Sequence, residues 1–170
     1  MTAKTTLHIR QATSEDVPLI LEFIRELADY EKLLHGVTAT AEHLHATMFC
    51  ANPYAEAILA FQNNQPIAFA IYFFNYSTFV GLPRLYLEDI YVRQAFRGSG
   101  VGRELLRFLA RKAIAADCWR MEWSVLNWNQ SAINFYTKLG AEAINDWTVF
   151  QLANEPLKKL AAEASGPATR

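Results

Sequence analysis

The stretch Arg97-Gly98-Ser99-Gly100-Val101-Gly102 decides how this sequence is interpreted, because it sets three glycines between an apolar run and a helical pattern. Glycine lets the backbone adopt positive φ and lets a ligand approach it closely. The first amide groups of a helix lack an intrahelical acceptor, so they suit an anion such as a phosphate. The stretch therefore indicates a phosphate-binding turn, and a plain flexible connection is the structural alternative.

This turn fits neither of two common phosphate-binding motifs. A P-loop needs Lys and then Ser or Thr in its final positions, whereas Arg103 and Glu104 follow Gly102 here. A dinucleotide-binding fingerprint needs a third glycine where Arg103 stands. The turn by itself therefore does not identify which phosphate-bearing ligand it binds.

Hydrophobic periodicity predicts alternating strands and helices on both sides of the turn. Thr13 with Ser14, and Thr40, are candidate caps of the first two helices, and Gly140 is a candidate C′ residue of the last. Antiparallel hairpins beside alternating elements predict an α/β (α+β) fold with a mixed sheet and helices on both faces. The expected strands are residues 7–11, 55–62, 66–76, 85–92 and 119–125, the expected helices are 14–32, 41–50, 101–116 and 130–140, and 141–144 with 147–152 form an expected closing hairpin.

Composition limits the classes of function. The 170 residues are 52% hydrophobic and carry a formal net charge of -1, which predicts one domain over residues 1–160 with a tail at 161–170. The charge balance disfavours a nucleic-acid surface. Because the chain has no apolar run of about 18 residues, no membrane span is expected. Residues 1–6 lack an apolar stretch, so no secretory signal is expected and a cytoplasmic location is the default.

Cysteine and histidine spacing predicts no metal site. Cys50 and Cys118 belong to no CxxC pair, so neither a disulfide framework nor a cysteine zinc site is supported. His43 and His45 face different directions if they lie on a helix, which disfavours a shared metal ion.

An acidic pair, Glu88-Asp89, interrupts the apolar strand expected over residues 85–92. Alternation sends the two side chains to opposite faces unless a bulge intervenes. A buried carboxylate needs a partner or a proton, and a salt bridge to an arginine is the structural alternative. Two adjacent acids just before the glycine turn favour a site that orients a cationic amine and accepts its proton.

A family resemblance rests on two motifs. Arg97-x-x-Gly100-x-Gly102 matches the (Gln/Arg)-x-x-Gly-x-(Gly/Ala) signature of the GCN5-related N-acetyltransferases, the GNAT superfamily. The run Asn129-Gln130-Ser131-Ala132-Ile133-Asn134-Phe135-Tyr136, followed by Gly140-Ala141, resembles a second family element in the same order. Segments 26–31, 85–92 and 134–136 resemble the diamine and polyamine enzymes, of spermidine/spermine and thialysine type. The resemblance covers nearly the whole chain and implies a GNAT-type sheet that is mostly antiparallel.

The resemblance implies acetyl-CoA as cosubstrate, without a metal. The glycine turn would hold its pyrophosphate, and strand backbone would pair with its pantetheine arm. For Asn129 and Ser131, ordinary helix capping is the alternative. The implied cofactor-binding residues are Ile90, Tyr91, Val92, Arg97, Gly98, Ser99, Gly100, Val101, Gly102, Arg103, Asn129, Ser131 and Tyr136.

The resemblance also implies catalytic and acceptor-binding roles. Glu88 would be the general base and Tyr136 the general acid, although by spacing alone Tyr136 reads as a core aromatic. For Glu31, Glu122 and Asp146 taken singly, a solvated surface charge is the alternative. The implied acceptor-binding residues are Tyr30, Glu31, Glu88, Asp89, Glu122, Trp123, Ser124 and Asp146.

The sequence departs from the animal spermidine/spermine enzymes in the loop before the Leu-Glu-Asp strand. Ser77 and Phe79 stand where those enzymes have an acid and a tryptophan, and Pro83-Arg84 lengthens the loop. Fewer carboxylates argue against a long polycation, so a short diamine or a lysine analogue is equally favoured.

The predicted function is transfer of an acetyl group from acetyl-CoA to a primary amine by direct attack in a ternary complex. Acetylation of a protein N-terminus or lysine is one alternative. A non-catalytic acyl-CoA-binding module is the other, and the presence of Glu88 and Tyr136 counts against it. The resemblance further implies a homodimer.

Overall fold

The computed structural model describes residues 6–163, and these fall into two compact units, Met1–Ser124 and Val125–Arg170. Residues 1–5, in the stretch for which no secretory signal is expected, and residues 164–170 of the predicted tail lie outside the described residues. The single domain predicted for residues 1–160 stays a prediction.

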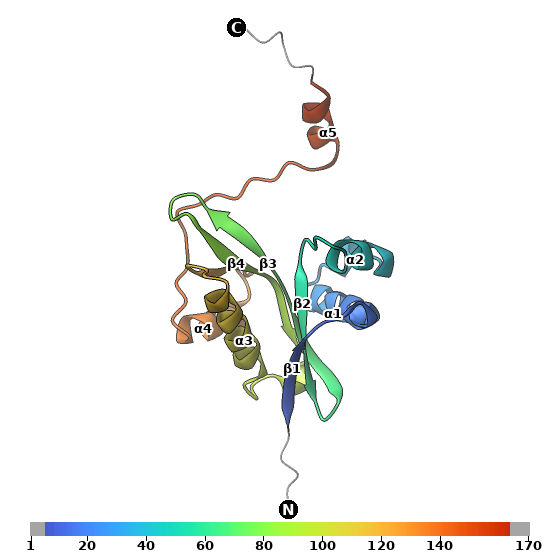
Figure 1. Cartoon of the computed structure of the whole chain (residues 1–170), viewed down its shortest axis with the longest axis vertical. Helices are drawn as coiled ribbons and strands as arrows, with labels where there is room; N and C mark the ends of the chain where they lie inside the picture. Colours follow the sequence, from blue (N-terminus) through green and yellow to red (C-terminus); the bar gives the residue numbers. More distant parts are fainter. Residues whose placement is uncertain (1–5, 164–170) are drawn as a thin grey trace, which may run out of the picture. The chain divides into compact units, whose positions relative to one another are not determined.

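The first unit is built on one five-stranded sheet in the order β1-β2-β3-β4-β5 (Figure 1). The first four strands pair antiparallel in sequence order, and β5 pairs parallel to β4. The prediction of a mixed, mostly antiparallel sheet is therefore confirmed. The strands are β1 Leu7–Gln11, β2 Glu56–Gln62, β3 Gln65–Ser77, β4 Leu82–Val92 and β5 Met121–Trp123.

Helices cover both faces of this sheet, as predicted: α1 and α2 lie on one face and α3 on the other (Figure 1). The first unit contains α1 Val17–Tyr30, α2 Ala41–Met48 and α3 Val101–Ala115, with the short 3-10 helices η1 Ser14–Asp16, η2 Leu34–Gly36 and η3 Gln94–Phe96. The second unit contains α4 Gln130–Lys138 and α5 Asn154–Ala162.

Apolar burial holds α1 and α2 on the sheet. Phe23 of α1 stacks on Phe69 of β3 with ring centroids 5.2 Å apart, and both side chains are fully buried. The same cluster contains Ile20 and Leu27 of α1, Met48 of α2 and Leu59 of β2. Burial of such side chains is the main favourable contribution to the folding of this unit.

Local signals place several helix ends correctly. The Thr40 hydroxyl oxygen accepts a hydrogen bond from the amide of His43 at 3.2 Å, so Thr40 caps α2. Gly140 follows α4 with φ +89°, the left-handed conformation expected of a C′ glycine. Thr13 forms a capping box with Asp16, although the first turn is the 3-10 helix η1 and α1 begins only at Val17.

The predicted closing hairpin of residues 141–144 and 147–152 is wrong. Residues 141–153 contain no strand, and Val149 and Phe150 are each 91% exposed. An isolated two-stranded hairpin is marginal without a sheet or helix to pack on, so two short apolar segments do not produce one by themselves. The helix α5, which takes up the first residues of the predicted tail, was not predicted. The strand expected over residues 119–125 is only β5.

We expect Phe69→Ala to lower the free energy of unfolding by about 3–5 kcal/mol, because it opens a cavity beside Phe23. Urea denaturation of the purified protein measures the change. Phe79→Ala is the matched control, since Phe79 is 93% exposed and its loss should change stability by less than about 0.5 kcal/mol. Equal effects of the two substitutions would contradict the packing described above.

Candidate active site

The glycine turn joins the end of β4 to α3 through η3. Gly98 and Gly100 have φ +76° and +90°, values that other residues rarely adopt, and an added Cβ at either would meet no atom within 4 Å. Gly100 is the N-cap of α3, and no side chain caps this helix. The hydroxyl of Ser99 donates to the carbonyl of Phe96 at 2.6 Å and so braces the turn. The uncapped first turn of α3 is thus available to an anion.

Arg97 connects this turn to α1 and β4. Its guanidinium lies 4.3 Å from the ring centroid of Tyr30 and 5.3 Å from that of Tyr91. Its Nε donates to the carbonyl of Val92 at 2.9 Å. The structure therefore brings Tyr30, a predicted acceptor-binding residue, next to Arg97, a predicted cofactor-binding residue.

A β-bulge in β4 determines where the acidic pair points. Opposite β3, Leu87 pairs with Tyr72 and Asp89 pairs with Ile71, so Glu88 is the extra residue of the bulge. Directly paired residues share a face of the sheet. Tyr72 lies on the α3 face, where Lys112 lies 5.2 Å from its ring. Ile71 lies in the cluster on the α1 face, so the bulge turns Asp89 to that face.

The ring contacts of Tyr91 confirm this change of face. Tyr91 pairs with Phe69, and its ring centroid lies 6.4 Å from those of Phe23 and Tyr30. Strict alternation from Leu87 would have sent both Asp89 and Tyr91 to the α3 face. The bulge thus gathers Asp89, Tyr91 and the end of α1 in one place.

The acidic side chains at the bulge influence one another. Burial, together with the negative charges of Glu88 and Glu31, raises the pKa of Asp89 to about 6. Burial alone raises the pKa of Glu31. In residues 6–163 no cationic side chain forms an ion pair with Asp89. Unpaired, half-buried acids with a perturbed pKa are typical of a functional site.

The backbone of β4 loses its second neighbour at the bulge. The pairing of β5 with β4 covers only Leu85, Tyr86 and Leu87. After Leu87, no described strand pairs with this edge of β4. The unpaired part of the edge includes the predicted cofactor-binding residues Ile90–Val92. An unpaired strand edge can bind an extended amide-bearing ligand by adding a strand.

Two arginines compensate the charge of Glu122. Its carboxylate forms an ion pair with Arg84 at 3.2 Å and another with Arg120, and its side chain is only 16% exposed. The charge of Glu122 is therefore already compensated within the unit, so the alternative of a solvated surface charge does not describe it. The expectation that Glu122 binds a cationic acceptor stays a prediction. Arg84 lies on β4 and Arg120 lies just before β5, so no local sequence signal marks this pairing.

The other predicted residues of β5 and its end have structural partners. The Ser124 and Tyr86 hydroxyls share a hydrogen bond at 3.0 Å. Trp123 pairs with Leu87 at the last position of the β4–β5 register.

The second unit carries the remaining predicted residues. The Asn129 side chain accepts a hydrogen bond from the amide of Ala132 at 3.2 Å. It therefore caps α4, which is the alternative to cofactor binding given for this residue above. Ser131 is exposed in the first turn of this helix. Tyr136 is half-buried, with its ring centroid 5.4 Å from that of Phe135. Asp146 is exposed in the segment between α4 and α5.

Residues 6–163 contain no group of 3 or more His, Cys, Asp or Glu side chains that could hold a metal ion. None of the helices in that range is long and apolar enough to cross a membrane.

Comparison with known proteins identifies the family. Residues 21–141 match the family described as "Acetyltransferase (GNAT) family". The chain belongs to the GNAT acetyltransferase family. This GNAT protein is 35% identical over 164 residues to the thialysine N-epsilon-acetyltransferase of Mus musculus, over 90% of this chain and 96% of that relative. Family membership makes the protein an N-acetyltransferase.

A second relative agrees with this assignment, and one solved structure has the same fold. Spermidine/spermine N(1)-acetyltransferase-like protein 1 of Homo sapiens is 37% identical over 172 residues, which cover 95% of this GNAT chain and 25% of the relative. An integron cassette protein from the mobile metagenome of V. cholerae superposes with a TM-score of 0.79 at 23% identity, over 94% of this chain and 100% of its own. The latter likeness shows the common fold.

We expect Asp89→Asn to raise the free energy of unfolding at pH 8 by up to about 3 kcal/mol and to change it little at pH 4. The folded protein binds the Asp89 proton more tightly than the unfolded chain, because the pKa rises from 3.8 to about 6. The Asp89 contribution to stability therefore falls as pH rises through this interval, and asparagine removes that loss. Urea denaturation at both pH values measures it.

Asp29→Asn is the matched control, since Asp29 is exposed near the end of α1. It should change stability by less than about 0.5 kcal/mol at either pH. A stability change for Asp89→Asn that is the same at pH 4 and pH 8 would show that its charge is not the cause.

Proposed function

We propose that this protein transfers the acetyl group of acetyl-CoA to a primary amine of a small cationic acceptor by direct attack in a ternary complex. The observation that carries the proposal is the bulge in β4, which turns Asp89 toward Glu31 beside the Arg97–Tyr30 contact. The bulge thereby sets three acidic side chains, Glu31, Glu88 and Asp89, next to a turn suited to phosphate. These three side chains are called the acidic slot below.

The glycine turn and the open edge of β4 fit acetyl-CoA. An added Cβ at Gly98 or Gly100 would meet no atom within 4 Å, so a diphosphate would have room beside these glycines at the uncapped start of α3. Arg97 and Arg103 would add positive charge there, and the backbone of residues 90–92 would pair with the pantetheine amides. In the second unit, Asn129 and Ser131 are further candidate contacts. When bound, acetyl-CoA supplies the acetyl group as an activated thioester.

The acidic slot answers the main chemical obstacle. An alkyl ammonium with a pKa of about 10.4 is almost entirely protonated at neutral pH, and only the free amine is a nucleophile. We assign Glu88 as the base that takes this proton, directly or through water, because it is exposed at the bulge and reachable by a ligand. Asp89 and Glu31 would hold the cation before it loses its proton.

Tyr136 is the proposed general acid. A phenol hydroxyl can donate a proton to the departing thiolate, so that coenzyme A leaves as the thiol. Its place on α4, directly after Asn134-Phe135, matches the second family element.

The acceptor we favour is a short diamine or a lysine-like amine such as thialysine. The acid group contains Glu31, Glu88 and Asp89, whereas Glu122 is neutralised by Arg84 and Arg120. A slot with few free carboxylates suits an acceptor with one or two positive charges better than a long polyamine. The name of the Mus musculus relative supports the lysine-like choice. Asp146 is a candidate for a further acceptor contact, and the homodimer and cytoplasmic location stay predictions.

An acceptor screen tests the proposal. Purified protein with acetyl-CoA should release coenzyme A in the presence of thialysine, lysine or putrescine, with a higher kcat/KM than with spermine or short peptides. Glu88→Gln should shift the pH dependence of kcat/KM to higher pH. Without the base, only amine that is already deprotonated can react, and its fraction rises with pH. Turnover confined to the peptides would favour protein acetylation, and binding without turnover would favour an acyl-CoA-binding module.

Tyr136→Phe is the control for the chemistry, since it removes only the hydroxyl. It should lower kcat by about tenfold or more while leaving acetyl-CoA affinity within about twofold. A variant with unchanged kcat would exclude Tyr136 as the acid.

We expect Gly100→Val to weaken acetyl-CoA binding by at least about tenfold, because a β-branched residue rarely adopts φ +90°. Isothermal titration calorimetry measures the affinity. Gly36→Val is the matched control, because Gly36 lies in η2, has open space around it and no positive φ. Wild-type affinity in Gly100→Val would refute the diphosphate assignment.

A further inference from the structure

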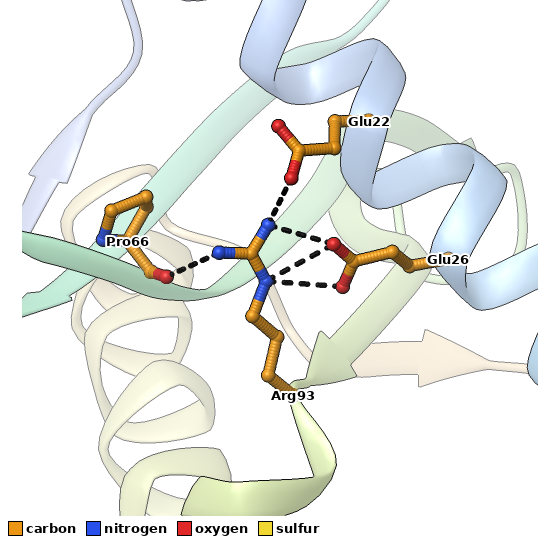
Figure 2. A network of polar contacts seen from close by, with 4 residues as sticks. All are labelled: Glu22, Glu26, Pro66 and Arg93. Carbon is orange, nitrogen blue, oxygen red and sulfur yellow. Dashed lines mark hydrogen bonds and ion pairs between the residues drawn. The ribbon is translucent and has the colours of Figure 1, made fainter.

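Arg93, which was not among the predicted site residues, joins three elements of the first unit (Figure 2). Its Nε donates to both carboxylate oxygens of Glu26 at 3.1 Å, and its Nη2 donates to Glu26 at 2.7 Å and to Glu22 at 2.5 Å. Its Nη1 donates to the carbonyl of Pro66 at 2.9 Å. The guanidinium also lies 4.7 Å from the ring centroid of Phe23. One side chain thus ties the end of β4 to β3 and to α1.

The same arrangement repeats one turn further along α1. Glu22, Glu26 and Tyr30 follow one another at helical spacing, so they share one face of the helix. Arg93 binds the two glutamates, and Arg97 lies over Tyr30. Both arginines flank the short helix η3 that leads into the glycine turn. Two guanidinium groups from one segment therefore hold successive positions of the α1 face.

We propose that Arg93 is a positioning residue for acetyl transfer, because its bonds to α1 set where Tyr30 and Glu31 lie relative to Asp89. It acts through those side chains and touches no reacting atom. The inference rests on the proposed function, in which Glu31 and Asp89 hold the amine.

Apolar packing alone already holds α1 on the sheet, so the Arg93 contacts must contribute something else. Ile20, Phe23 and Leu27 already bury α1 against the sheet. That burial is non-directional, so it constrains the position of the helix along its axis less than a directional contact does. A forked, charge-assisted contact is directional and fixes that position. The Arg93 side chain is only 21% exposed, so solvent screens its contacts less than those of a typical surface pair.

Arg10 supplies a matched control at the other end of the same helix. Its two terminal nitrogens donate to the two oxygens of Asp16 at 2.6 and 2.8 Å, and its guanidinium lies 4.9 Å from the ring centroid of Phe61. Asp16 is the N-cap of α1. This pair therefore has the same chemistry as the Arg93 contact, but it lies at the opposite end of α1 from Tyr30 and Glu31.

The experiment compares Arg93→Met and Arg10→Met with the wild-type enzyme, using the best acceptor of the screen. Methionine keeps an unbranched apolar stem and loses the fork. Arg93→Met should raise the amine KM by about tenfold and leave acetyl-CoA affinity within about twofold. Arg93→Lys, which keeps the charge without the fork, should retain most of that increase. Arg10→Met should lower Tm and leave the amine KM within about twofold. Equal changes of KM in the two methionine variants would overturn the proposal.

Hydrogen exchange gives a second readout that needs no turnover. Amides of residues 28–33 should exchange at least about threefold faster in Arg93→Met than in Arg10→Met, because the end of α1 is released. If the wild-type protein acetylates no amine and this difference is present, the proposed function fails while the tie to α1 stands. If wild type is active and Arg93→Met changes neither KM nor exchange, the positioning role fails. Should Arg93→Met not fold, Glu26→Gln tests the same contact, and an unchanged amine KM there would overturn the role.

Discussion

The β-bulge at Glu88 is the constraint on which the site depends. A strand that alternates strictly can offer only one of two adjacent acids to a given face. The extra residue breaks that alternation between Leu87 and Asp89, so the two sides of the bulge serve different layers. Leu85 and Leu87 face α3, whereas Asp89 and Tyr91 face α1. The bulge also stands where β5 ceases to pair with β4, so one local irregularity coincides with an acidic slot and an open backbone edge.

Some carboxylates near β4 form ion pairs with arginines, and others do not. Glu122 receives two guanidinium groups, and Glu22 shares Arg93 with Glu26. Asp89 receives none from the described part of the chain, although burial and its acidic neighbours make its ionised form costly. A fold selected for stability alone would pair or remove such a carboxyl. The cost is understandable when a cationic ligand supplies the missing partner.

Local features of this fold were predictable from the sequence, whereas features that depend on distant residues were not. The glycine spacing of residues 98–102 reports a backbone need that is purely local, and the observed φ of Gly98 and Gly100 is the conformation that only glycine adopts easily. The apolar residues within 141–152 suggested a closing hairpin, yet none forms, because a strand needs a neighbouring strand that local sequence does not supply. The two ion pairs of Glu122 were not predicted for the same reason, since its partners come from β4 and from the residue before β5.

The sequence by itself determined the family, the strand–turn–helix around the glycines and the presence of an acidic pair, because each depends on short-range patterns. It predicted that Glu88 and Asp89 face opposite sides unless a bulge intervenes, and left that condition open. Only the tertiary structure decided it, because a bulge is a register shift between β3 and β4 that neither strand encodes alone. The tie between Arg93 and α1 is likewise invisible in sequence, since it joins residues 67 to 71 positions apart that meet only when the helix packs on the sheet.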